Sequence, residues 1–196
     1  MKKLLALCAI SAAAVVPAVA SAADPSPADF KNAAKFCKAF KAASGSSFAT
    51  MFGTKKNAYG KCVSQTARQT ASEDAAQEKA AHTNAAKQCK AERDDAGFAA
   101  AHGGKTFEQF YGTGNGSNAY GKCVSQKAKA QKAEADEEDE AQEEDRINAA
   151  QTCKKAKRDD PAKFEQDYGS RRNAFGKCVS RTAKQFAADR HEESQG

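Results

Sequence analysis

The sequence predicts an all-α protein made of three small, disulfide-closed helical hairpin repeats, joined by long helices able to pair like coiled coils. Three observations support this class. An eight-residue segment occurs three times with one change, as NAYGKCVS at 57–64 and 118–125 and as NAFGKCVS at 173–180. Each copy follows a segment of NAA, two residues and Cys, which begins at Asn32, Asn84 and Asn148. Residues 65–96 and 126–160 lack Gly and Pro and are rich in Ala, Lys, Glu and Gln, so each favours one continuous helix.

The first 22 residues have the features of a secretory signal peptide. Lys2 and Lys3 precede an apolar run over 4–19, and small residues follow at 20–22. An uncleaved anchor is the alternative, but the run is shorter than the roughly 20 residues of a membrane span and contains Pro17. We expect a mature chain from Ala23, secreted or held in the periplasmic or cell-envelope space, with Cys8 removed.

The mature chain divides into repeat unit 1 (23–70), repeat unit 2 (71–130), and an acidic linker helix with repeat unit 3 (131–196). Scarce large aliphatic residues beyond the signal favour several small cores. Each unit is expected to form a leading helix, a short helix and a returning helix. In each short helix two aromatics lie one turn apart and a glycine follows, which predicts a left-handed cap: Phe48, Phe52 and Gly53; Phe107, Tyr111 and Gly112; Phe164, Tyr168 and Gly169.

Local signals define the helix starts and the facing core positions. Each short helix is preceded by residues that favour a helix start: Ser46 or Ser47, Thr106 with Gln109, and Asp160 before Pro161. The predicted N-caps of the returning helices are Asn57, Asn118 and Asn173. In unit 1, helical spacing places two sets of residues face to face: Phe30, Ala33, Ala34, Cys37 and Phe40 on the leading helix, and Tyr59, Cys62, Val63, Thr66 and Ala67 on the returning helix.

Six cysteines remain after signal removal, an even number typical of disulfides in exported proteins. Cys62 and Cys89 lie about 40 Å apart on one predicted helix, and Cys123 and Cys153 about 45 Å apart on the next, so neither pair can be bridged. Of the fifteen connectivities we favour three structural disulfides within units: Cys37 with Cys62, Cys89 with Cys123, and Cys153 with Cys178. Zinc and redox roles are less favoured because there is no CxxC and the histidines do not recur with the cysteines. No cofactor is expected.

Residues 134–145 contain nine carboxylates. Such a run could bind calcium weakly or dock a basic partner, but it lacks the ligand pattern and central glycine of an EF-hand loop. We interpret it as a solvated, self-repelling stretch of helix, frayed in part.

Two clusters of basic residues are candidate polyanion sites. One is a stripe on the first helix, and the other lies on the leading helix of unit 3: Lys31, Lys35, Lys38 and Lys41, and Lys154, Lys155, Lys157 and Arg158. Such patches could hold nucleic acid, anionic lipid or an anionic wall polymer. Nucleic acid is the less favoured partner because the aromatics fall at core positions. A solvated polar face is the alternative for both clusters.

A lysine and a serine three residues later recur in every unit, as in Lys61 and Ser64. Three copies of one catalytic pair, without a matched His, Asp or Glu, argue against a nucleophile and base. We therefore predict no enzymatic activity.

The module NAAKxCK to NAYGKCVS resembles a recurring module of uncharacterised secreted bacterial proteins, over most of the mature chain. That resemblance implies export and repetition, and brings no activity or ligand. The function expected from the sequence is a non-catalytic structural spacer or protein-binding module at or outside the cell envelope. The alternatives are a polyanion binder acting through its basic helix faces and, less favoured, a small secreted enzyme.

Overall fold

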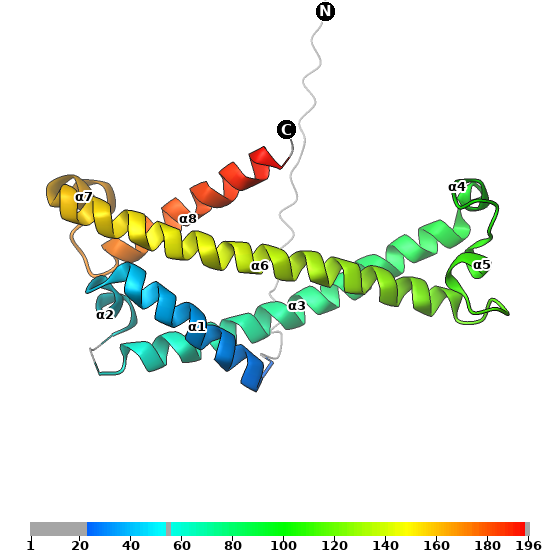
Figure 1. Cartoon of the computed structure of the whole chain (residues 1–196), viewed down its shortest axis with the longest axis horizontal. Coiled ribbons are helices and arrows are strands. Elements are labelled where there is room, and N and C mark those ends of the chain that lie inside the picture. Colours follow the sequence, from blue (N-terminus) through cyan, green and yellow to red (C-terminus); the bar gives the residue numbers. More distant parts are fainter. Residues whose placement is uncertain (1–22, 54–55, 195–196) are drawn as a thin grey trace, which may run out of the picture.

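A computed structural model describes residues 23–53 and 56–194, and within these ranges it contains helices and no strands (Figure 1). The predicted signal peptide lies outside the described residues. The helices are α1 (Pro27–Ser44), α2 (Ser47–Phe52), α3 (Ala58–Asp94), α4 (Phe98–Ala101), α5 (Phe107–Tyr111), α6 (Ala119–Asp159), α7 (Pro161–Tyr168) and α8 (Ala174–Glu193). The two long uninterrupted helices expected from the sequence are α3, with 37 residues, and α6, with 41.

Three disulfides join the within-unit cysteine pairs expected from the sequence. Cys37 bonds to Cys62 between α1 and α3, Cys89 to Cys123 between α3 and α6, and Cys153 to Cys178 between α6 and α8. Each pair has a Cα–Cα distance of 6.0 Å, and all six cysteines are buried. We call the three disulfide-closed regions hairpin 1, hairpin 2 and hairpin 3 in chain order.

The two long helices fold back on one another, so the hairpins do not follow each other along a single line. α3 and α6 pack antiparallel, with Ala81 and Ala85 of α3 against Ala128 of α6. Small side chains let the two helices approach closely here, and polar pairs such as Lys132 with Asp74 flank the seam. We call this middle part, residues 67–85 of α3 with 128–145 of α6, the stalk.

Folding back brings hairpins 1 and 3 together at one end of the stalk and leaves hairpin 2 alone at the other (Figure 1). Phe36 and Phe40 of α1 belong to the same buried cluster as Phe164 of α7 and Phe175 of α8. The expectation of separate small cores is therefore wrong for these two hairpins, and holds for hairpin 2, whose core contains Phe98, Phe107 and Tyr111. We call hairpins 1 and 3 together the shared pole.

The short helices carry the predicted aromatic pairs, with ring centroids 4.8 to 5.0 Å apart. Thr106 and Gln109 form a capping box, and Asp160 accepts a hydrogen bond from the backbone N–H of Lys163. Gly53 and Gly169 have positive φ but extended ψ, of −155° and 167°, and Gly112 has φ −71°, so the predicted left-handed cap is wrong at all three. Gly112 is instead required by a close approach, because a Cβ would lie 2.2 Å from the carbonyl oxygen of Glu108.

Two further expectations are corrected. None of Asn57, Asn118 and Asn173 caps its helix through its side chain, because their backbones are not extended as that hydrogen bond requires. Phe30 and Tyr59 were placed on core faces, but they are 42% and 40% exposed. The Tyr59 ring lies at the surface because its hydroxyl donates to the Ala34 carbonyl, at 3.0 Å.

Candidate functional site

The structure gathers part of the predicted basic residues into one groove at the shared pole. Lys154, Lys155 and Arg158 of α6 line a space of about 590 Å³. Its floor consists of small residues of α1, among them Ala39 and Ala42, which present no side chain large enough to fill it. All three cations are exposed, and we call this space the α1–α6 groove.

The four lysines of the predicted α1 stripe do not join this groove. Lys35 lines a different space, where it faces carboxylates of the acidic run, and the Lys41 ammonium lies 6.0 Å from the Tyr59 ring centroid. Lys31, Lys38 and Lys157 are exposed and line none of these spaces. The eight candidates therefore form no single patch.

A second basic surface of the shared pole was missed in the sequence. Lys177, Arg181 and Lys184 of α8 line a shallow space of about 640 Å³, together with Asn173 and Ser180. Their spacing of four and three residues places them on one helical face, and that pattern was the available signal. Two separate grooves of the same pole thus present unburied positive charge.

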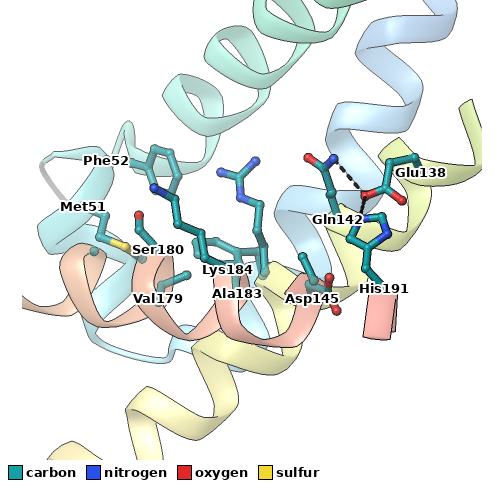
Figure 2. Close-up of a pocket in the computed structure, with 14 residues that line it drawn as sticks. Met51, Phe52, Glu138, Gln142, Asp145, Val179, Ser180, Ala183, Lys184 and His191 are labelled. Atoms are coloured by element: carbon teal, nitrogen blue, oxygen red, sulfur yellow. Dashed lines mark hydrogen bonds and ion pairs between the residues drawn. The ribbon is translucent and has the colours of Figure 1, made fainter. Parts of the chain in front are cut away.

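The acidic run of α6 is neither frayed nor wholly solvated, because α8 lies against it. The Arg190 guanidinium donates to Glu138 at 2.9 Å and to Asp145 at 2.8 Å. The hydrogen bond from Arg190 lowers the pKa of Glu138 below its usual range. Figure 2 shows Gln142 and His191 also directed at Glu138. The basic partner that the run docks is thus a residue of the same chain, and the solvated interpretation is wrong at these positions.

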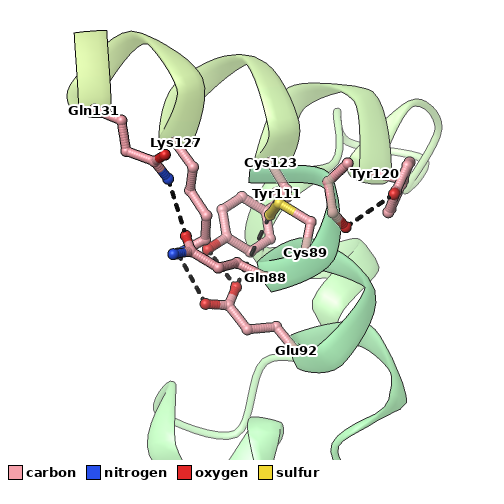
Figure 3. The surroundings of a disulfide bond; sticks show 9 residues. Gln88, Cys89, Glu92, Tyr111, Tyr120, Cys123, Lys127 and Gln131 are labelled. Carbon is pink, nitrogen blue, oxygen red and sulfur yellow. Dashed lines mark hydrogen bonds and ion pairs between the residues drawn. A yellow bond between two sulfur atoms is a disulfide. The ribbon is translucent and has the colours of Figure 1, made fainter. Parts of the chain in front are cut away.

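Hairpin 2 contains a polar cluster beside its disulfide (Figure 3). The Tyr111 hydroxyl donates to Glu92 at 2.8 Å, and the Lys127 ammonium contacts the other oxygen of Glu92 at 2.8 Å. Burial works to raise the pKa of Glu92, but hydrogen bonds from Lys127 and Tyr111 outweigh it and the pKa is lowered. Burial and the bond to Glu92 raise the pKa of Tyr111. The cluster holds a carboxylate and a protonated phenol at neutral pH, which suits a structural role better than proton transfer.

The described residues contain no group of three or more His, Cys, Asp and Glu side chains placed to hold a metal ion. In the part of the chain that the structure covers, no helix has the length and apolar character of a membrane span. Comparisons with protein families, with curated proteins and with solved structures find no match to this chain.

Proposed function

We propose that this chain is an exported, non-catalytic binding protein that attaches to an anionic polymer of the cell envelope through its shared pole. The stalk acts as a spacer that holds hairpin 2 away from the attached surface. The observation that supports this is the separation of charge along the molecule. The pole, over residues 27–53, 56–66 and 150–184, has sixteen Lys and Arg against five Asp and Glu, whereas residues 134–145 carry nine carboxylates.

This separation favours a polymer over a single anion. The α1–α6 groove has three cations, and the α8 face, formed by Lys177, Arg181 and Lys184, has three more, so a long anion can contact several of them at once. Each neutralised charge releases a counterion, so affinity accumulates over many weak contacts and falls steeply with salt. The carboxylates of the stalk repel the same polymer and confine binding to the pole.

An anionic wall polymer is favoured over nucleic acid because of what lies between the cations. The floor of the α1–α6 groove is alanine, and no aromatic ring lines it or the α8 face. Single-stranded nucleic acid gains about 1–3 kcal/mol per base from stacking on exposed rings, which these two surfaces do not offer.

Retention on heparin and polyphosphate columns at increasing salt tests the proposal. The triple variant Lys154→Gln, Lys155→Gln, Arg158→Gln should elute at lower salt, with the salt dependence of log K reduced by about one for each lost contact. The matched control is Lys87→Gln, Lys90→Gln, Lys105→Gln, which removes the same charge from exposed positions of hairpin 2. Equal effects of the two triples, or no retention of the parent chain at low salt, would contradict the proposal.

A second candidate function, protein binding at hairpin 2, is favoured by one observation. Phe110 is 45% exposed, and its ring centroid lies 4.6 Å from that of His102 and 5.8 Å from that of Phe98. Phe98 and His102 lie within the residues that make unit 2 longer than the others, so this aromatic surface is particular to hairpin 2.

The two exposed phenylalanines give a matched test of that candidate. Phe110→Ser should abolish capture of a defined envelope protein, whereas Phe30→Ser, at a 42% exposed position of hairpin 1, should leave the capture intact. Loss in both variants, or in neither, would argue against a protein-binding role for hairpin 2.

A further inference from the structure

A pocket of about 500 Å³ lies between α2, α6 and α8 of the shared pole (Figure 2). This volume falls within the range of roughly 300–1,000 Å³ that is typical of small-molecule sites. Its apolar wall combines Met51 and Phe52 of α2 with Val179, Ala183 and Ala187 of α8. The pocket shares no lining residue with the α1–α6 groove, but it shares Gly176, Ser180 and Lys184 with the basic surface of α8.

The sequence repeat accounts for the apolar stripe that forms part of this wall. Ala183 and Ala187 lie five and nine residues after Cys178, as Ala67 and Ala71 lie after Cys62. On α3 these alanines are buried, whereas on α8 they are only half-buried. The apolar stripe of α8 is thus less deeply packed than the equivalent stripe of α3, and the pocket lies beside it.

The charges around the pocket are not balanced. Glu138 and Asp145 line it, but both carboxylates are already bound by Arg190. Arg146 and Lys184 also line it, and among the described residues neither has a carboxylate oxygen within 4.0 Å. Arg146 and Lys184 are therefore the cations of the pocket that no described carboxylate contacts, although Glu143 and Glu73 act on Arg146 from a greater distance.

Arg146 is held at the pocket by packing instead of by an ion pair. Its guanidinium lies over the Phe36 ring, 4.9 Å from the centroid, and burial lowers its pKa. A half-buried guanidinium with no carboxylate in contact carries a desolvation cost that an anion bound directly to it would offset. Its planar donors match the oxygens of a carboxylate or phosphate in two-point contact.

We propose that this pocket binds a single-chain amphiphile with an anionic headgroup, such as a medium-chain fatty acid. The alkyl chain lies along the apolar wall of α2 and α8, and the headgroup contacts Arg146 with Lys184 at the rim. Headgroup and chain are recognised by different residues, so their contributions can be removed one at a time.

Binding of dodecanoate, dodecyl phosphate and dodecanol to the full mature chain, measured by calorimetry below the micellar concentration, tests this assignment. Both anionic ligands should bind at least tenfold more tightly than dodecanol. Arg146→Met should weaken the anionic ligands at least tenfold and leave dodecanol within about twofold. Preference for one anionic ligand identifies the headgroup as carboxylate or phosphate.

Variants that fill the pocket distinguish ligand binding in the pocket from binding to the basic surface of the pole. Ala183→Phe should abolish binding of all three ligands, and Ala187→Leu provides a milder filling variant if the first does not fold. Lys184→Met should weaken dodecanoate, whereas Lys177→Met, on the same helix but outside the pocket, should not.

Three results would overturn the proposal. Dodecanoate binding that survives both filling variants would belong to the charged surface of the pole. Binding of dodecanol as tight as that of dodecanoate would remove the headgroup site. A dimer that dissociates on Ala183→Glu would show that a second copy of the chain covers the stripe.

Discussion

At the residue scale, hairpin 2 differs from the other two at the fourth residue after its second cysteine. Four residues beyond that cysteine, hairpins 1 and 3 have Thr66 and Thr182, whose hydroxyls lie 3.7 and 3.8 Å from a cysteine sulfur. Hairpin 2 has Lys127 there, and its ammonium contacts Glu92. Hairpin 1 has Phe40 at the position that corresponds to Glu92. A charged pair thus replaces apolar packing in the hairpin with the smaller core.

We predict that Glu92→Gln destabilises the protein by about 1 kcal/mol at pH 7, because Lys127 and Tyr111 lose a charged acceptor. The folded-state pKa of Glu92 is lowered, so its contribution is complete above the unfolded pKa, near 4.5, and disappears as the pH falls through the folded value. Urea unfolding at pH 7 and pH 3 should show a difference between parent and variant that shrinks at the lower pH. The control Glu108→Gln, at an exposed residue of α5, should show no such difference at either pH.

At the element scale, α3 and α6 contact each other through alanine. Ala85 is fully buried against α6, while Ala80, on the opposite face of α3, is exposed. Alanine is the best helix former, so helix propensity does not distinguish Ala80 from Ala85. The two positions differ in whether α6 packs over them. The close contact of the stalk therefore depends on side-chain size along one face of α3.

Substitution with leucine should change the free energy of unfolding differently at the two positions. We predict that Ala85→Leu destabilises the protein by about 1–3 kcal/mol, because the added atoms must push α3 away from α6. Ala80→Leu should change the free energy of unfolding by less than about 0.5 kcal/mol. Urea denaturation followed by circular dichroism measures both, and equal losses would show that the alanine seam is not close-packed.

Removal of a disulfide should have a local effect in hairpin 2 and a global effect in hairpin 1. The core of hairpin 2 has six buried residues, whereas hairpins 1 and 3 share fifteen. We predict that Cys89→Ala with Cys123→Ala, which removes a constraint of about 3 kcal/mol or more, opens hairpin 2 locally. Hydrogen exchange should increase over residues 95–117 and leave the shared pole protected. Cys37→Ala with Cys62→Ala should lower global stability without opening hairpin 1 alone, because its core continues into hairpin 3.

How far the sequence predicts this architecture depends on the range of each interaction. The long helices and the aromatic pairs of the short helices follow from local spacing, and helix length excludes two of the possible cysteine pairs. The pairing of hairpins 1 and 3 depends on contacts such as Phe36 with Arg146, more than 100 residues apart, which no local pattern reports. The ion pairs of the acidic run are hidden from local patterns for the same reason, because Arg190 lies 45 residues beyond Asp145. The pocket between α2, α6 and α8 depends on both kinds of information. The apolar stripe of α8 follows from sequence periodicity, but the exposure of that stripe depends on tertiary packing.

At the scale of the whole molecule, the antiparallel stalk determines the overall dimensions. The 41 residues of α6 span about 60 Å, and α3 runs back along it instead of extending it. Two rods end to end would span more than about 110 Å, whereas a compact globule of this length would have a radius of gyration near 16 Å.

Small-angle X-ray scattering of residues 23–196 should therefore give a maximum dimension well below the end-to-end value and a radius of gyration clearly above the globular one. Reduction of the disulfides provides the control, because the stalk is held by α3–α6 packing and should keep its length while hairpin 2 loosens. A maximum dimension near 110 Å would mean that α3 and α6 separate in solution. In that case hairpins 1 and 3 would lie too far apart to share a core, and both the basic pole and the pocket beside Arg146 would be lost together.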